Sequence, residues 1–177
     1  MTSDPIKQPD PWLRGPVEGV SDALLPVAHA FIAAREDVGK ALTGLSAAHL
    51  WAQPGGAASI GFHLMHMAGV TDRLLTYGRG AALTDQQKTT LAAEKTAPEP
   101  RPTAGELLKA WDAAVEHALT QIGETKDGEL GTSRVIGRAQ LPSTVRGLLF
   151  HAAEHAARHA GQIVTTAKVV RASIAAT

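Results

Sequence analysis

Four long stretches of this chain carry apolar residues at the spacing of an amphipathic helix. In the first, from about Asp22 to Leu42, the repeating apolar positions are Leu25, Ala28, Ile32 and Val38. The other three run from Ala57 or Ser59 to Tyr77, from Thr103 to about Ile122, and from Ser143 or Thr144 to roughly Arg171. The third begins with a capping box, in which Thr103 is followed three residues later by Glu106. The pattern therefore predicts four long helices.

Shorter pieces and frequent Gly and Pro separate these stretches. Residues 46–51 predict one further helical turn before Pro54, Gly55 and Gly56 break the chain. Residues 85–95 predict a helix that is too short and polar to be central. Residues 126–141 contain three glycines and predict an irregular excursion, with one extended piece at residues 134–136.

Four helices that each carry one apolar face can bury those faces only against one another. The predicted fold class is therefore all-α, and the simplest architecture is an antiparallel four-helix bundle. Connections of about 15, 25 and 20 residues exceed the usual bundle loops and permit crossovers, so periodicity alone leaves the helix order open. Residues 1–20 hold four prolines and predict an irregular arm that Trp12 and Leu13 tie to the body. Residues 21–177 then form the bundle domain.

Charge and composition narrow the class of protein. The 177 residues carry 17 basic and 17 acidic side chains, so the formal net charge is zero and nucleic-acid binding is disfavoured. The chain has no cysteine, which excludes disulfides and thiolate metal sites and leaves His, Asp and Glu as possible metal ligands. No apolar run is long enough for a membrane span, and the first residues do not form a secretory signal. These features predict a cytoplasmic protein.

The eight histidines include a cluster on the last predicted helix. His155 and His159 lie four residues apart, which places them about 40° apart on one helix face with Cβ atoms roughly 6 Å from each other. His151 lies one turn earlier on the same face, and Gln162 and Thr166 continue it. Two imidazoles in this arrangement can bind one metal ion.

The second predicted helix offers His63 and His66 as further ligands. If His66 faces His155 and His159, three neutral imidazoles meet at one ion with a coordination position left open, as in catalytic sites. Nitrogen ligands favour Zn, Ni or Fe(II) over Mg or Ca. The plainer interpretation is that the histidines only form ordinary hydrogen bonds, which we expect of His29, His49 and His117.

The sequence also suggests roles for other polar and aromatic residues. Glu154 and Arg158 suit an ion pair at the edge of the histidine face. Arg73 and Tyr77 share a stripe with His66 and suit either packing at the bundle end or substrate contact. The simplest prediction for the three tryptophans is that they fill space in the core or in a lid over it: Trp12, Trp51 and Trp111.

Two segments carry a family resemblance: SIGFHLMHMAGVTDRLLTYGRG and LPSTVRGLLFHAAEHAARHAGQI. They resemble the DinB/YfiT-like superfamily of metal-dependent proteins, whose last long helix ends in an H-x-x-x-H-x-G-Q-like motif. Here the motif runs from His155 to Gln162. The resemblance covers residues from about 20 to 172 and implies an up-down-down-up four-helix bundle, a divalent metal on three histidines, and a homodimer. It implies His66, His155 and His159 as the metal ligands, in preference to His63.

Related members of this superfamily include transferases and isomerases that use mycothiol, bacillithiol or glutathione. The first hypothesis is therefore an enzyme whose metal activates a low-molecular-weight thiol or water against a small electrophile, as an S-transferase or hydrolase. His63, His151 and Glu154 are the candidate catalytic acids or bases, because groups that titrate near neutral pH suit proton transfer. The alternatives are a non-catalytic metal- or ligand-binding module of a stress response, and a metal-free bundle that associates with a partner.

Overall fold

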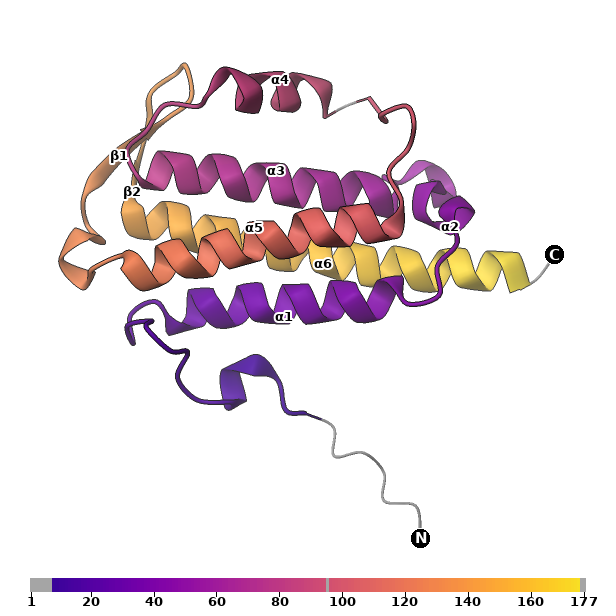
Figure 1. Cartoon of the computed structure of the whole chain (residues 1–177), viewed down its shortest axis with the longest axis horizontal. Coiled ribbons are helices and arrows are strands. Elements are labelled where there is room, and N and C mark those ends of the chain that lie inside the picture. Colours follow the sequence, from indigo (N-terminus) through magenta and orange to yellow (C-terminus); the bar gives the residue numbers. More distant parts are fainter. Residues whose placement is uncertain (1–7, 95, 176–177) are drawn as a thin grey trace, which may run out of the picture.

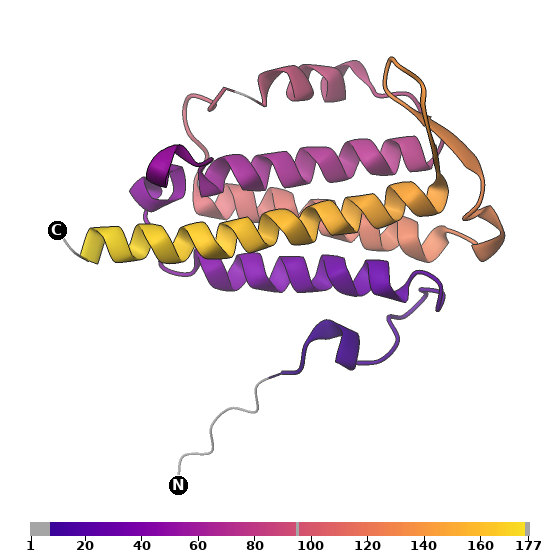
Figure 2. The same cartoon turned by 180° about the vertical axis from the view of Figure 1, so that it is seen from behind.

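The computed structural model describes residues 8–94 and 96–175, and it is almost entirely helical. The four long helices are α1 (Leu25–Leu42), α3 (Ile60–Gly78), α5 (Ala104–Glu124) and α6 (Val145–Ala175). They lie side by side, and α1 and α6 run in the direction opposite to α3 and α5 (Figures 1 and 2). The predicted all-α class is confirmed.

The core forms where the apolar faces of these four helices meet. α3 packs on α6 and α5, and α1 packs on the same two helices. Trp111 of α5 is fully buried, with its ring centroid 6.5 Å from that of Phe31 on α1. Burial of such large apolar side chains is the main stabilising contribution to the fold.

Small side chains line α6 where it meets its neighbours. The buried alanines on this helix are Ala152, Ala153, Ala156, Ala160 and Ala167. Because an alanine side chain adds so little bulk, the backbones of facing helices can approach closely there. α6 can thus bring polar side chains on the same face within reach of α3.

Short elements connect the long helices. They are α2 (Ala47–Trp51), α4 (Asp85–Ala93), three single 3₁₀ turns (Pro11–Leu13, Pro54–Gly56 and Asp127–Glu129) and the strands β1 (Ser133–Ile136) and β2 (Leu141–Thr144). The strands pair antiparallel, with Ser133 opposite Thr144. The predicted extended piece is confirmed as β1, whereas β2 was not predicted from the sequence. Thr144 still accepts a hydrogen bond from the Gly147 backbone N–H at 3.1 Å and so caps α6 as predicted.

α4 lies over α3 and has no buried residue of its own (Figure 1). Its start is held by Gln87, whose amide donates hydrogen bonds to Asp72 Oδ2 at 2.7 Å and to Thr76 Oγ1 at 2.8 Å. Just past its end, Glu94 is buried against α3. Polar contacts near both ends, rather than apolar packing, therefore hold α4 in place.

The expectation for the N-terminal arm is wrong in one respect. Trp12 and Leu13 do not tie the arm to the body, because they are 66% and 56% exposed. Pro11 is buried instead, and Arg14 forms an ion pair with Glu36 of α1. The extreme terminus, residues 1–7, lies outside the described residues.

Candidate metal centre

Three histidines from α3 and α6 meet where these two helices pack against each other. The ring centroids of His155 and His159 are 4.4 Å apart, and each lies 5.0 Å from that of His66. One ligand nitrogen from each ring lies within 4.8 Å of the other two. The structure thus brings together the three residues predicted as ligands, and all three are half-buried.

The helix starts fix the register that makes this meeting possible. Ser59 caps α3, and its hydroxyl accepts a hydrogen bond from the Phe62 backbone N–H at 3.2 Å. His66 follows on the face that contacts α6. On α6, the buried alanines allow the close approach, and the four-residue spacing of His155 and His159 directs both rings to the same side.

A buried carboxylate holds the ring of His66. Glu94 Oε2 lies 3.0 Å from His66 Nδ1, and the other carboxylate oxygen of Glu94 pairs with Arg73. The side chains of Glu94 and Arg73 are only 8% and 9% exposed. A carboxylate on one ring nitrogen fixes the orientation and tautomer of a metal-binding histidine, which leaves the other nitrogen, Nε2, available as the ligand atom.

His63 plays the corresponding part for His159. Its Nδ1 lies 3.0 Å from His159 Nδ1, so one of these nitrogens carries the hydrogen and donates it to the other. His63 is 6% exposed, and burial, with a smaller effect of the charge on His66, lowers its pKa below the ordinary value. A neutral His63 can accept the hydrogen and leave His159 Nε2 available as the ligand atom.

The rings of His155 and His159 are neutral at physiological pH. Burial lowers the pKa of His155 and of His159 to about 4, and the positive charges of neighbouring histidines and Arg158 act in the same direction. A neutral imidazole has the free electron pair that a metal ion requires. The donor set contains three imidazole nitrogens and no carboxylate, and it therefore fits Zn, Ni or Fe(II) better than Mg or Ca.

These pKa values predict a pH dependence of the metal-free protein. In the unfolded chain His155 and His159 titrate near their ordinary pKa of 6.5, whereas in the folded chain they titrate at about 4. Between these values the unfolded state binds more protons, so stability is fully present above pH 6.5 and falls as the pH drops toward 4. We expect the melting temperature in EDTA to fall across this window.

A double variant isolates the contribution of the two rings. His155→Gln with His159→Gln removes both titrating groups, and its melting temperature should change less between pH 6.5 and pH 4 than that of the original protein. An equal slope for both proteins would show that other groups account for the acid sensitivity.

The remaining candidate residues lie toward the solvent. His151 is half exposed, and its Nδ1 lies 3.3 Å from Glu154 Oε2. A hydrogen bond from Arg158 lowers the pKa of Glu154, which keeps this carboxylate ionised. The predicted ion pair of Glu154 with Arg158 is confirmed. Gln162 and Thr166, which were predicted to continue the histidine face of α6, differ in burial, because Thr166 is buried and Gln162 is exposed.

The plainer interpretations hold for several other residues. His29 Nε2 lies 2.9 Å from the Gly15 carbonyl oxygen, and His49 completes the capping box of α2. Trp111 is a core residue, Trp51 packs against Gly61, and the prediction of Trp12 as a filler is wrong because this side chain is exposed.

Sequence reasoning missed Glu94 because it follows a short, polar segment 28 residues after His66 and shares no helix face with it. The available signal was Gly69, one turn after His66 on the same stripe. A Cβ on Gly69 would lie 2.6 Å from Glu94 Oε1 and 2.9 Å from Arg73 Nη1. Only a glycine leaves room for the carboxylate and the guanidinium to meet there. Arg73 serves this ion pair rather than either of its predicted roles.

Gly69→Ala is therefore expected to weaken metal binding and to destabilise the fold. The added methyl group would push apart the buried carboxylate of Glu94 and the buried guanidinium of Arg73, and Glu94 would lose its place beside His66. We expect roughly tenfold weaker Zn²⁺ affinity, at the lower end of the effect of losing such a partner. Competition with a fluorescent chelator measures the affinity, and the melting temperature in EDTA measures the stability.

The matched control is Gly105→Ala in the first turn of α5, where a Cβ meets no atom within 4 Å. This variant should bind the metal as the original protein does. If Gly69→Ala also bound it unchanged, Glu94 would not be needed to orient His66.

A helical bundle whose facing helices join three histidines, one of them held by a buried carboxylate, has the construction of a metal-binding bundle protein. The family model of the DinB superfamily matches residues 30–163 of this chain, a span that includes all three histidines. The chain belongs to the DinB superfamily. No curated protein matches it.

Proposed function

We propose that this protein is a divalent-metal-dependent enzyme, built on an up-down-down-up four-helix bundle, that joins a low-molecular-weight thiol or water to a small electrophile. His66, His155 and His159 would hold the ion. The observation that carries the proposal is the convergence of three imidazoles, two of them with a hydrogen-bond partner on Nδ1.

The number of protein ligands favours a catalytic metal site over a closed structural one. Three protein ligands leave positions for other molecules on the ion. A divalent ion on neutral ligands lowers the pKa of a thiol or water that it binds, which supplies a nucleophile near neutral pH. The chain contains no cysteine, so a thiol substrate would come from solution.

The chain's own residues supply orientation and a place for a proton. Glu94 and Arg73 fix His66, and His63 fixes His159. His63 accepts the hydrogen of His159 at Nδ1 and carries its own hydrogen on Nε2, so its role is to orient His159. Ionised Glu154, paired with His151, can accept a proton at the solvent edge of the site.

Turnover of a fluorogenic electrophile tests the enzymatic proposal. Monochlorobimane would be offered with mycothiol, bacillithiol and glutathione in turn, to protein loaded with Zn²⁺, Ni²⁺ or Fe²⁺. We expect faster conjugation with one thiol in the presence of metal, and loss of this gain in His155→Ala. His117→Ala, an exposed histidine of α5, is the matched control.

The same assay distinguishes a metal-dependent enzyme from a non-catalytic metal- or ligand-binding module. A protein that binds the metal but gives no turnover of this electrophile or of a hydrolysable ester panel would be the binding module instead of an enzyme. The homodimer is a separate proposal, and sedimentation equilibrium of the metal-loaded protein would measure it.

A further inference from the structure

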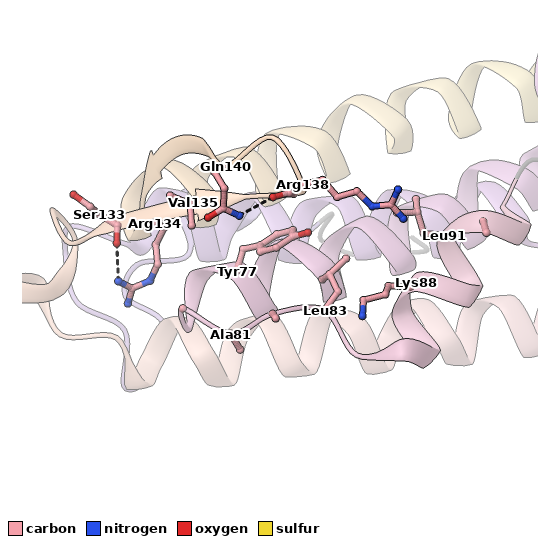
Figure 3. Close-up of a pocket in the computed structure, with 14 residues that line it drawn as sticks. Tyr77, Ala81, Leu83, Lys88, Leu91, Ser133, Arg134, Val135, Arg138 and Gln140 are labelled. Carbon is pink, nitrogen blue, oxygen red and sulfur yellow. Dashed lines mark hydrogen bonds between the residues drawn. The ribbon is translucent and has the colours of Figure 1, made fainter.

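A cavity lies at the C-terminal end of α3, between α4 and the β1–β2 hairpin. It has a volume of about 1000 Å³ and is lined by 14 residues (Figure 3). This size is at the upper end of sites that bind drug-sized molecules, about 300–1,000 Å³. Three separate segments of the chain build it, namely the end of α3, residues of α4, and the hairpin.

Large apolar side chains form much of the cavity wall. Tyr77 lies between the hairpin and Leu83, while Leu91 projects from α4 (Figure 3). Leu91 and Val135 are 45% and 50% exposed, which is high for leucine and valine. Covering these side chains with a ligand would remove apolar surface from water, and this favours a ligand with an apolar body.

All the charged side chains that line the cavity are basic. Its described lining residues include Lys88, Arg134 and Arg138 and no acidic side chain. Arg134 is already engaged, because its Nε donates to the Gly78 carbonyl at 2.8 Å and its Nη1 to the Ser133 carbonyl at 2.9 Å. These bonds hold the hairpin against the end of α3.

Arg138 has no such partner. Among residues 8–94 and 96–175, no side chain or carbonyl forms a hydrogen bond or ion pair with its guanidinium. It reaches from the hairpin turn toward Leu91 on the opposite wall (Figure 3). Lys88 lies on the α4 side and pairs with Asp85 at 2.9 Å, outside the lining. Arg138 is thus the unpaired cation beside the apolar wall.

This cavity is distinct from the metal centre. None of the three histidines lines it, and Tyr77 lies 11 residues after His66, about 16 Å along the axis of α3. The two sites are connected through α3, which carries both His66 and Tyr77, and through α4, whose Leu91 lines the cavity and which ends just before Glu94.

We propose that the cavity binds a small organic anion with an apolar body, of the class of medium-chain or aryl-substituted carboxylates. The carboxylate pairs with the guanidinium of Arg138, which suits planar two-oxygen groups, and the apolar body lies on Leu91, Val135 and Tyr77. This binding does not require the metal, and it does not rest on the proposed enzymatic function.

Calorimetric titration with decanoate tests the proposal, with decyltrimethylammonium as the probe of equal chain length and opposite charge. We expect saturable binding of decanoate at one site and markedly weaker binding of the cation. Arg138→Met should lower decanoate affinity about tenfold, because a charge-assisted hydrogen bond is lost while the apolar stem remains. Arg146→Met, which removes an exposed arginine of α6 outside the cavity, is the matched control and should have no effect.

A second variant tests the apolar wall. Val135→Glu places a like charge beside the bound carboxylate and should abolish binding, while the half-exposed position tolerates the change in the fold. Equal affinity for the two probes, equal loss in the two arginine variants, or no saturable binding would each overturn the proposal. The titration is repeated on His155→Ala in EDTA, where decanoate should bind unchanged whether or not the metal centre proves catalytic.

Discussion

Replacing His159 with alanine is expected to abolish the rise in melting temperature that Zn²⁺ or Ni²⁺ gives the original protein. A ligand that binds only the folded state stabilises it by about 2.7 kcal/mol when its concentration is 100 times the Kd. Removing one of three imidazoles leaves His66 and His155 as a two-histidine site. We expect the affinity to fall by at least the 10–100-fold that loss of a ligand's hydrogen-bond partner typically causes.

The measurement is a thermal melt in EDTA and with added metal, on protein purified without a polyhistidine tag. The control is His117→Ala on α5, which removes one imidazole far from the cluster and should keep the full metal-dependent rise. An intact rise in His159→Ala would show that the metal binds elsewhere in the chain.

Glu94→Ala is expected to have a large effect on both folding and metal binding. The change leaves the buried guanidinium of Arg73 without its partner, and removing one member of a buried ion pair typically costs about 3–5 kcal/mol. It also frees the ring of His66, so the Zn²⁺ affinity should fall about 10–100-fold. Urea unfolding in EDTA measures the first effect and chelator competition the second.

A surface ion pair provides the matched control for Glu94. Glu116 pairs with Arg35, but its side chain is 63% exposed, so Glu116→Ala should cost less than about 1 kcal/mol and leave metal affinity unchanged. Combining Glu94→Ala with Arg73→Met should recover part of the lost stability, because the unpaired charge is gone. Metal affinity should remain low in the double variant. Stability losses of equal size in Glu94→Ala and Glu116→Ala would contradict the importance of burial.

The long helices could be predicted because their signals are local. The spacing of apolar residues, the Thr103 and Glu106 capping box, and the hydroxyls that cap α3 and α6 all lie within a few residues of the features they determine. The i, i+4 pair of His155 and His159 is also local. A further ligand from the second long helix could be proposed because that helix carries His63 and His66, but the preference for His66 came from the family resemblance.

The features that could not be predicted from the sequence depend on contacts between distant segments of the chain. β2 has a weak strand sequence with Pro142, and it forms because the hairpin turn and the start of α6 place it beside β1. The exposure of Trp12 follows from where Pro11 and Arg14 attach the arm, which no periodicity encodes. Glu94 reaches His66 only because α4 folds back over α3, so its role became visible only in three dimensions.

The polar attachment of α4 has a consequence for how the protein moves. A helix with no buried side chain contributes little to the cooperative unit formed by the apolar core, so it can open while the bundle stays folded. Amide hydrogens of residues 85–93 should therefore exchange with deuterium ahead of those of α3 beneath them. Each opening would carry Glu94 off His66 and uncover a wall of the anion cavity together, so that one local fluctuation would loosen two sites at once.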